Sequence, residues 1–330
     1  MAGSGGMSPP CNYSVVTKLC PVEARWSRGR AQEACENISG PMTGIDLHAH
    51  TVYSDGTYPP RRTISLARER RLDTVAITDH DTTGGLDEAL AAGGELGVQV
   101  VPGVEFSTLY RDEGVHILCY FMDASDPDFA AELQRLRADR FSRGELMVRK
   151  LQELGYPISF ERVREIAEGG NIVRPHVAQA LVEAGVVPTL KDAFTEELIG
   201  SNGRAYVEKH ALHPLDALAL IHQAGGVCVL AHPGTWRETS PAPRELLDEL
   251  AGAGLDGIEA SHPEHTPEVE ADYIRTAQRL GLFWTGSSDC HGERYDPVRL
   301  GMRTTPVEQY ERLKTRAAEL RLARARAEPV

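Results

Sequence analysis

Short apolar runs alternate with segments of helical hydrophobic spacing along most of this chain. The alternation begins near residue 43, breaks near residue 123 and resumes near residue 206. This order of elements predicts a parallel α/β architecture of the barrel type. The expected strands are residues 43–48, 74–78, 98–106, 226–231, 256–260 and 282–287, and the expected helices are residues 61–71, 86–96, 214–224, 243–253 and 266–280.

The two remaining parts of the chain have a different pattern. Residues 123–205 lack β-branched runs and have the charged composition of long helices, expected at 126–154 and 160–184. The sequence therefore predicts a barrel built from residues 42–122 and 206–330, with residues 123–205 as a helical insertion. Residues 1–41 show no sustained period, so we expect a disordered extension, which a start site assigned too far upstream would explain.

The net charge of the chain limits the kinds of phosphorylated substrate that it is expected to bind. The chain has 48 acidic and 35 basic residues and a net charge of −13, so its surface as a whole should repel phosphate polyanions. Contacts with phosphate must then be local, which favours small or short substrates over duplex DNA. The basic segment at 312–326 is expected to be a solvated helix face rather than a nucleic-acid contact.

Targeting signals and paired cysteines are missing from the sequence. No apolar run reaches membrane-span length, and no basic segment precedes an apolar one at the start, so we expect a cytoplasmic protein. The six cysteines form no C-x-x-C pair and are expected to be free thiols.

Side chains of metal-ligand type stand where the expected strands end. His48 and His50 are two residues apart in an extended segment, so both imidazoles can face one ion. Apolar strands that end in such residues are typical of an active site on the top face of an α/β barrel. The residues concerned are Asp46, His48, His50, Asp55, Asp79, His80, Asp81, Glu105, His116, His232, Asp289 and His291.

Some of these residues also fit structural roles. His116 alternates with apolar neighbours, as an ordinary hydrogen-bonded strand histidine would. Asp79 and Asp81 fit a turn and a helix N-cap, and Asp46 fits a residue that orients a histidine without touching metal. What favours a metal site is that ligand-type side chains occur at so many strand ends together.

These segments resemble the signature motifs of the PHP (polymerase and histidinol phosphatase) phosphoesterases. The matching strings are DLHAHTVYSDGTYPP at 46–60, AITDHDTTGG at 76–85, GVEFS at 103–107, AHPG at 231–234 and SSDCH at 287–291. The resemblance implies a distorted (β/α)7 PHP barrel with a small helical insertion that serves as a lid, here residues 123–205, and a cluster of two or three divalent metal ions. It also implies nine ligands, namely His48, His50, Asp55, His80, Glu105, His116, His232, Asp289 and His291.

The insertion carries NIVRPH at 171–176, which resembles the stand-alone bacterial members of that family. These members are phosphatases of AMP-like or 3′,5′-bisphosphate nucleotides, or 5′-to-3′ exoribonucleases that act on short RNA. An all-nitrogen and oxygen ligand set suits Mn²⁺, which we expect, as well as Fe²⁺ or Zn²⁺. Such ions would generate a bridging hydroxide for in-line attack on phosphorus.

Beyond the ligands, the sequence offers candidates for catalysis and substrate binding. We expect His232 and Asp289 to act in catalysis and Arg174 to clamp phosphate, because a guanidinium can hold two phosphoryl oxygens at once. His176, His262 and His265 are candidate acids for the leaving group, with His176 and His262 expected to face substrate, although a structural role is equally open for each.

Three other functions remain open from the sequence. Histidinol phosphate phosphatase would use the same barrel and metal set on a different phosphomonoester. A non-catalytic metal-binding module, as found attached to polymerases, is disfavoured by the complete ligand set. A metal-dependent amidohydrolase fits the spacing of the ligands but makes the Arg174 clamp unnecessary. The sequence leaves the choice of nucleotide substrate and the oligomeric state undecided.

Overall fold

The computed structural model describes residues 44–111, 113–209, 211–235 and 242–327. Within them, a seven-stranded sheet runs in the order β1 to β7. The strands are β1 (Ile45–Asp46), β2 (Thr74–Ile77), β3 (Gln99–Tyr110), β4 (Glu113–Tyr120), β5 (Val227–Leu230), β6 (Gly257–Ser261) and β7 (Phe283–Gly286).

The sheet curves into a nearly closed barrel. A parallel bridge between Ala49 and Cys290 joins the segments that follow β1 and β7, and the His50 N–H donates to the Cys290 carbonyl at 2.8 Å. This confirms the predicted distorted seven-stranded α/β barrel. Because the bridge lies beyond the ends of the two strands, the residues that follow β1 and β7 are held side by side.

The expectation of an all-parallel sheet was wrong for the middle of the barrel. The pairs β3–β4 and β4–β5 are antiparallel, whereas the other neighbouring strands are parallel. The strand expected to end at Phe106 continues to Tyr110 and pairs with β4 as a hairpin. A parallel pair needs a long crossover connection, and the few residues between β3 and β4 cannot supply one.

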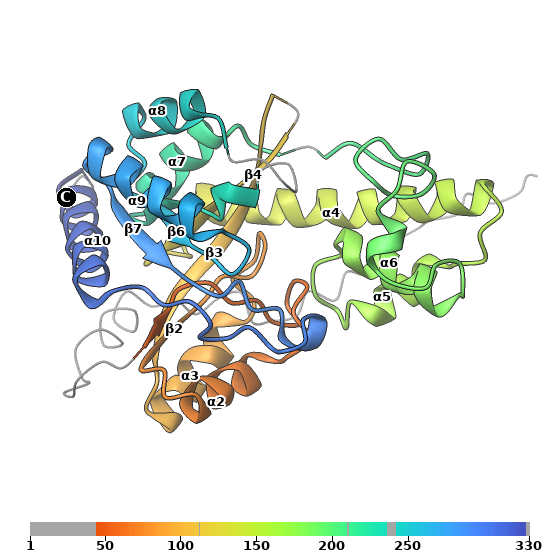
Figure 1. The fold of residues 1–330 in the computed structure, drawn as a ribbon, viewed down its shortest axis with the longest axis horizontal. Helices are drawn as coiled ribbons and strands as arrows, with labels where there is room; N and C mark the ends of the chain where they lie inside the picture. The colour runs from red at the N-terminus through yellow and green to blue at the C-terminus, as the bar shows by residue number, and fades with distance from the viewer. Residues whose placement is uncertain (1–43, 112, 210, 236–241, 328–330) are drawn as a thin grey trace, which may run out of the picture.

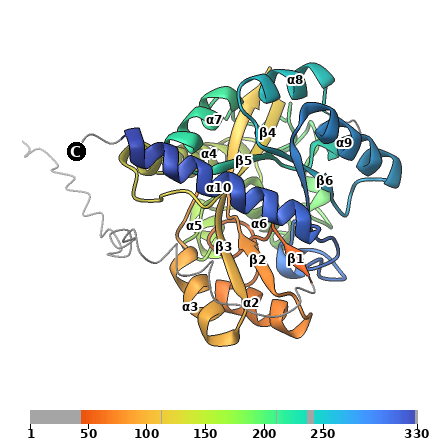
Figure 2. The ribbon, with the colours of Figure 1, turned by 90° about the vertical axis from the view of Figure 1, so that its left-hand side faces the viewer.

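In the described residues, five helices flank the barrel and a sixth, α10, lies across one end of it (Figure 1, Figure 2). They are α2 (Pro60–Glu69), α3 (Leu86–Leu96), α7 (Pro214–Gln223), α8 (Arg244–Gly252), α9 (Pro267–Leu280) and α10 (Val307–Ala327), and short 3-10 turns follow β5 (Pro233–Thr235) and β7 (Gly292–Arg294). Helix α10 lies across one end of the barrel, where Tyr310 and Leu313 pack with the inward-facing Leu47, Val101 and Tyr120. The site that the sequence predicts at one end of the barrel must therefore lie at the end opposite α10.

The arginines of α10 hold this helix to the barrel. The Arg316 Nε donates to Asp256 Oδ1 at 2.7 Å, and the Arg324 guanidinium contacts Asp126 at 3.0 Å. A guanidinium engaged by a buried carboxylate is less available to a polyanion than a free one. This agrees with the view that the basic segment is not primarily a nucleic-acid contact.

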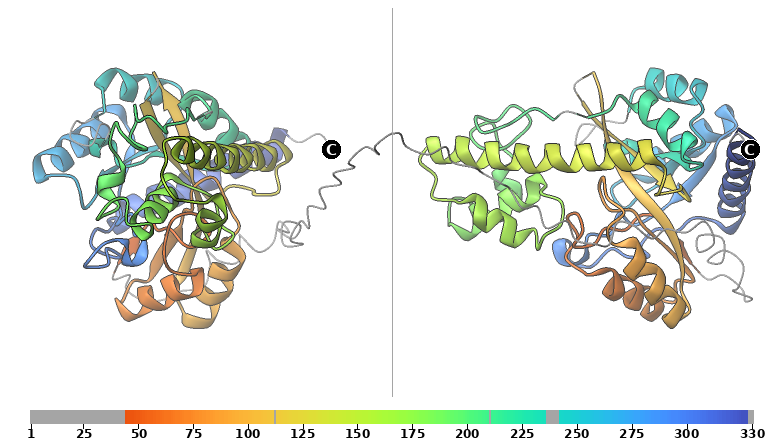
Figure 3. Two further views of the ribbon diagram at one scale, coloured as in Figure 1. Left: turned by 90° about the vertical axis from the view of Figure 1, so that its right-hand side faces the viewer. Right: turned by 180° about the vertical axis from the view of Figure 1, so that it is seen from behind.

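The insertion forms a lobe beside the barrel (Figure 1, Figure 3). Its long helix α4 (Pro127–Glu153) runs out from the barrel, with α5 (Phe160–Ile166), α6 (Arg174–Glu183) and a short 3-10 turn (Lys191–Ala193) near the far half. The lobe has a hydrophobic cluster of its own that includes Val148, Val163, Val177 and Leu181.

The single helix expected at 160–184 is two helices in the structure. Glu168 and Gly169 have φ values of 48° and 85°, which an α-helix cannot contain, and α6 restarts with a proline in its first turn. The break matters because it brings residues 170 and 171 against the barrel, where the Asn171 N–H donates to the Tyr53 carbonyl at 3.0 Å.

Other expectations concern the whole chain. No helix in the described residues has the length and apolarity needed to cross a membrane. The described cysteines Cys119, Cys228 and Cys290 are buried free thiols, as expected. The extension predicted at 1–41, with its three cysteines, lies outside the described residues.

Candidate metal centre

The candidate ligands gather at the end of the barrel opposite α10. His48 and His50 follow β1, His80 follows β2, and His232 follows β5. Asp289 and His291 follow β7 and are brought beside the first pair by the bridge that closes the barrel. Carboxyl ends of parallel strands meet at one edge, which is why residues far apart in the sequence converge here.

Glu105 and His116 enter the site from within the hairpin, not from strand ends as expected. Ser107 lies opposite His116 in the β3–β4 register, and Glu105 shares the face of Ser107 two residues earlier. Glu105 and His116 are therefore diagonal neighbours on one face, close enough for their side chains to meet. The extra length of β3 beyond Glu105 is what creates this pair.

Glu105 lies in the middle of the cluster of candidate ligands. Both of its oxygens are buried and are surrounded by the nitrogen atoms of five imidazoles from four segments of the chain. Its Oε2 lies 3.3, 3.1 and 3.0 Å from nitrogen atoms of His48, His50 and His80, and its Oε1 lies 2.8 and 3.0 Å from those of His116 and His232. Glu105 would therefore help to hold any metal ion that these histidines bind.

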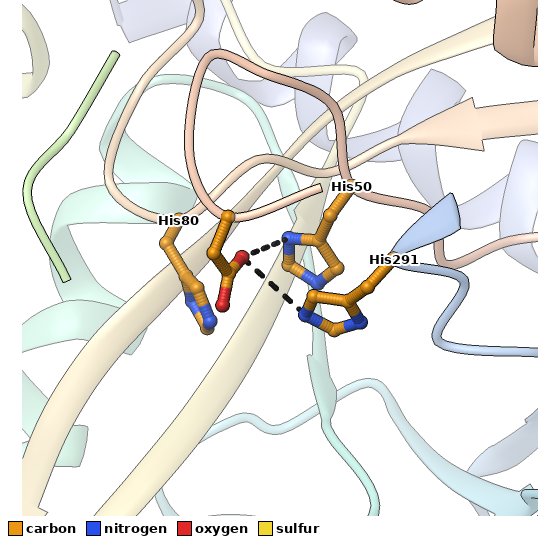
Figure 4. Close-up of side chains that lie close together, drawn as sticks. His50, His80 and His291 are labelled. Atoms are coloured by element: carbon orange, nitrogen blue, oxygen red, sulfur yellow. Dashed lines mark ion pairs between the residues drawn. The ribbon is translucent and has the colours of Figure 1, made fainter. Parts of the chain in front are cut away.

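Two aspartates complete the cluster. Asp55 Oδ1 lies 3.3 Å from His291 Nε2 and 3.6 Å from His50 Nδ1. Figure 4 shows His50, His80 and His291 pointing toward one another across this space. Asp289 Oδ1 lies 3.2 Å from His50 Nε2 and 3.3 Å from His48 Nε2. All nine residues that the resemblance implied are therefore brought together.

The hydrogen bonding of these side chains fits a metal cluster. Buried Asp55 Oδ1, His80 Nδ1, His116 Nδ1 and Asp289 Oδ1 have no hydrogen-bond partner, although opposite groups lie within 4 Å. Buried polar atoms are nearly always hydrogen-bonded unless something else satisfies them. Three overlapping groups have ligand atoms within 4.8 Å of one another: His50, Asp55, His80 and His291; His48, His50 and Asp289; and His80, Glu105 and His116.

Burial and neighbouring charges shift the pKa values of the ligand side chains. Burial opposes the charge on Asp55, Glu105 and Asp289, but the surrounding imidazoles outweigh it and hold the three carboxyl pKa values well below the ordinary range. Burial lowers the pKa of His80 to about 3, which leaves this imidazole neutral with a free lone pair. Burial opposes the charge on His48, His50 and His232, but the carboxylates beside them outweigh it and raise their pKa values, in the case of His50 to about 10. Metal binding would therefore displace protons that these imidazoles share with the carboxylates.

A further layer of carboxylates holds the ligand-bearing segments. Asp79 accepts hydrogen bonds from the Thr51 N–H (2.8 Å), the Thr51 hydroxyl (2.6 Å) and the Ser54 hydroxyl (2.6 Å), and so fixes the loop that presents Asp55. Asp46 accepts from the His48 backbone N–H, so it supports the backbone and not the imidazole.

Sequence reasoning missed Glu259, which is fully buried in β6. Burial opposes its charge, yet His48 and its other histidine neighbours lower the pKa of Glu259 to about 2. A single carboxylate inside the apolar run GIEAS was the signal that could have revealed it.

The three candidate acids differ in their surroundings. His262 Nε2 is buried without a hydrogen-bond partner and lies 3.5 Å from Asp289 Oδ2, so it faces the ligand cluster. His265 is occupied on both nitrogens, by the Ala260 carbonyl and the Gly234 N–H. His176 lies in α6 beside a cavity of about 310 Å³, and burial lowers its pKa to about 4.

A group of cations stands beside the ligands, and only Arg174 of this group was foreseen. Arg140 contacts Asp81 at 2.6 Å and donates to Ser107 Oγ, which places it next to the hairpin. Arg143 and Arg174 both lie against the Tyr206 ring, at 5.8 and 5.9 Å. Burial and these three arginines lower the pKa of Lys209 to about 7, and Lys209 in turn acts on His116.

Comparison with known proteins places this site in a family. The PHP domain model matches residues 46–165. A 5′-3′ exoribonuclease of Haemophilus influenzae is 32% identical over 74% of this chain and 89% of its own length. A 3′,5′-nucleoside bisphosphate phosphatase of Chromobacterium violaceum is 33% identical over 76% of this chain and 88% of its own.

The fold agrees with these matches. The solved structure of a candidate metal-dependent phosphoesterase from Bifidobacterium adolescentis superposes with a TM-score of 0.78 at 36% identity, covering 84% of this chain and 98% of that one. Sequence identity above 30% across nearly the whole length of relatives, together with the assembled ligand cluster, leads to one conclusion. The chain belongs to the PHP domain family and is a metal-dependent phosphoesterase.

Proposed function

We propose that this enzyme hydrolyses a phosphate ester of a nucleotide that carries a second phosphate, either a nucleoside 3′,5′-bisphosphate or the 5′-phosphorylated end of a short RNA. The observation that carries this proposal is the group of cations formed by Arg140, Arg143, Arg174 and Lys209 beside the metal ligands. Relatives of this chain named for these two activities add independent support.

The four cations lie close enough to repel one another, although Asp81 and Asp139 act on them in the opposite direction. Asp81 is the acid in contact with Arg140, and Arg143 donates through Nε to the carbonyl of Val207. Burial, together with repulsion from Arg174 and Arg140, lowers the pKa of Arg143 to about 10. A bound phosphate would relieve this repulsion, and arginine forks match phosphate geometry.

The insertion supplies three of these four cations, so we propose that residues 123–205 act as a lid over the metal centre. Arg140 and Arg143 lie on α4, and Arg174 begins α6. Lys209 lies just past the insertion. A substrate whose first phosphate occupies the metal centre would then meet the lid with its second phosphate.

We propose that the nine clustered residues hold two or three divalent ions, with Mn²⁺ the best candidate for their nitrogen and oxygen ligands. When bound, such ions lower the pKa of a coordinated water and stabilise the charge that develops on the phosphoryl oxygens. His232 and Asp289 would act in catalysis by holding these ions. His262 faces the cluster with an unpartnered Nε2, which suits a donor to the leaving-group oxygen.

The alternatives fit the cation group less well. Histidinol phosphate carries an amine and an imidazole, which four neighbouring cations would repel. A non-catalytic module would need neither a complete ligand set nor a phosphate-binding lid. A nucleotide with two phosphates would bind one of them at the ligand set and the other at the cation group.

The test is a substrate panel with the Mn²⁺-loaded full chain and His232→Ala as the blank. Adenosine 3′,5′-bisphosphate should be turned over faster than either adenosine monophosphate, and a 5′-phosphorylated RNA faster than the same RNA with a 5′-hydroxyl. Equal rates within each pair would refute the role of a second phosphate. Turnover of histidinol phosphate alone would favour the alternative substrate class.

A further inference from the structure

Glu259 joins three strand ends at the base of the metal centre. Its Oε1 lies 3.0 Å from His48 Nδ1 and accepts a hydrogen bond from the Ser287 hydroxyl at 2.5 Å. Its Oε2 accepts a hydrogen bond from the His232 backbone N–H at 2.7 Å. These partners follow β1, β7 and β5, so a single side chain from β6 connects segments that lie far apart in the sequence.

The bond to His48 decides which nitrogen of this histidine is free. An ionised carboxylate can only accept hydrogen bonds, so His48 Nδ1 must carry the proton. The lone pair of the neutral ring is then on Nε2, which lies 3.3 Å from both Glu105 Oε2 and Asp289 Oδ1. Nε2 is thus the nitrogen that faces the other ligands, and the hydrogen bond to Glu259 orients the ring so that Nε2 is the nitrogen offered to a metal.

The bond to His232 supports an unusual backbone conformation. His232 has a φ of 25°, a region that non-glycine residues rarely adopt. Such strain persists only where surrounding interactions hold it. The short hydrogen bond from the His232 N–H to Glu259 opposes relaxation, and the imidazole of His232 reaches Glu105 Oε1 at 3.0 Å as a result.

We propose that Glu259 is a positioning residue of the metal centre, which sets the tautomer of His48 and holds the backbone of His232 so that both imidazoles face the same ions. Glu259 does not itself contact substrate or the reacting atoms in this arrangement. The inference rests on the metal centre and is independent of which phosphate ester the enzyme hydrolyses.

Replacement of Glu259 by glutamine tests both hydrogen-bonding roles, because an amide has one accepting oxygen and one donating nitrogen. With the amide oxygen toward His48 and Ser287, its NH2 confronts the His232 N–H, donor against donor. With the amide reversed, its NH2 favours a His48 ring that is protonated on Nε2, which cannot bind metal. Either orientation weakens one ligand while the volume of the side chain is unchanged.

The experiment measures Mn²⁺ affinity of the full chain by competition with a chelating dye. Glu259→Gln should bind Mn²⁺ about 10- to 100-fold more weakly, and activity should recover as Mn²⁺ is raised toward saturation. The matched control is Glu264→Gln, the same chemical change five residues away at a carboxylate that is 45% exposed and paired with Arg299. The control should keep the wild-type affinity.

A second measurement uses the unaltered chain, so the proposal remains testable if Glu259→Gln fails to fold. Nitrogen-15 spectra of the Zn²⁺-loaded protein report the tautomer of each imidazole, and His48 should carry its proton on Nδ1. Wild-type Mn²⁺ affinity in folded Glu259→Gln, or a His48 proton on Nε2 in the Zn²⁺ form, would overturn the proposal. No substrate enters either measurement, so failure here is distinct from failure of the proposed function.

Discussion

Replacement of Lys209 by methionine tests the role of the cation group most directly. Lys209 is partly buried beside Arg140, Arg143 and Arg174, and methionine keeps most of its length and apolar volume. The change therefore removes one charge with little effect on packing. If the group binds a second phosphate, the loss should appear only with substrates that carry one.

The expected magnitude follows from the contact that is lost. A hydrogen bond to a charged group contributes about 1.5–3 kcal/mol, which corresponds to a roughly 10- to 100-fold change in a binding constant. Lys209 is not fully buried, so solvent should hold the effect toward the lower end. We expect KM for adenosine 3′,5′-bisphosphate to rise about 10- to 30-fold, with kcat nearly unchanged.

The pH dependence gives a second signature. Burial and the arginines lower the pKa of Lys209 to about 7, so this side chain is charged below pH 7 and neutral above it. Phosphate binds the charged form, and hence KM of the unaltered enzyme for the bisphosphate should rise as pH increases through 7. Lys209→Met should lose this rise, and Lys209→Arg should lose it while binding as tightly as at low pH.

The assay is steady-state kinetics from pH 6 to 9 with the bisphosphate and with the monophosphate that retains only the scissile group. Lys191→Met is the matched control, because Lys191 is an exposed lysine of the insertion. An equal loss with both substrates would mean that Lys209 contacts the scissile phosphate instead. A KM in Lys209→Met that equals the wild-type value would refute the cation group as a binding site.

Three further predictions concern the metal, the lid contact and the far end of the barrel. Chelation should lower the melting temperature, and Mn²⁺ at 100 times its Kd should restore about 2.7 kcal/mol of unfolding free energy; a melting temperature independent of Mn²⁺ would contradict the metal assignment. Gly170→Ala should lower kcat about 100-fold, because its Cβ would meet the Val52 carbonyl and displace the loop that presents Asp55, whereas a folded variant with normal kcat would show that this contact does not position the site. Asp256→Asn should lower the free energy of unfolding in urea by about 1–2 kcal/mol, because it weakens the pairing of this buried side chain with Arg316, which is itself 38% exposed, while kcat at 25 °C stays normal; a loss of kcat without a loss of stability would contradict this prediction.

Much of the fold could be predicted because the hydrophobic pattern is local. The runs around Val75 and Val229 are short and fully apolar, which is the pattern of a strand buried on both faces. The β3–β4 hairpin was missed because both strands carry polar side chains such as Glu105, Ser107 and His116 on the face toward the site. The side chains needed at the site are polar, and they occupy strand positions where a simple strand pattern would have apolar residues.

The break in the insertion was missed for a related reason. Composition at 160–184 favours helix throughout, and a glycine pair alone lowers helix propensity by only about 1 kcal/mol per residue. The chain leaves the helix at Glu168 and Gly169 because residues 170 and 171 pack on the barrel loop at Val52 and Tyr53. Tertiary contact, rather than local preference, determined the ends of α5 and α6.

The identity of the residues that can bind metal follows from local sequence. His, Asp and Glu side chains at the ends of apolar strands carry their ligand chemistry wherever the backbone goes, and the strands fix their direction. The motifs at 46–60 and 287–291 are therefore sufficient, as amino-acid strings, to indicate a phosphoesterase centre.

The way those ligands are held, and what stands beside them, depends on the tertiary structure. Glu259 acts through His48 and His232, and Lys209 acts with arginines from another lobe, and none of these partners is near in sequence. Hydrogen bonds and Coulomb interactions depend on distances of a few ångströms in space. Local sequence patterns carry no such distances until the barrel closes and the insertion packs against it.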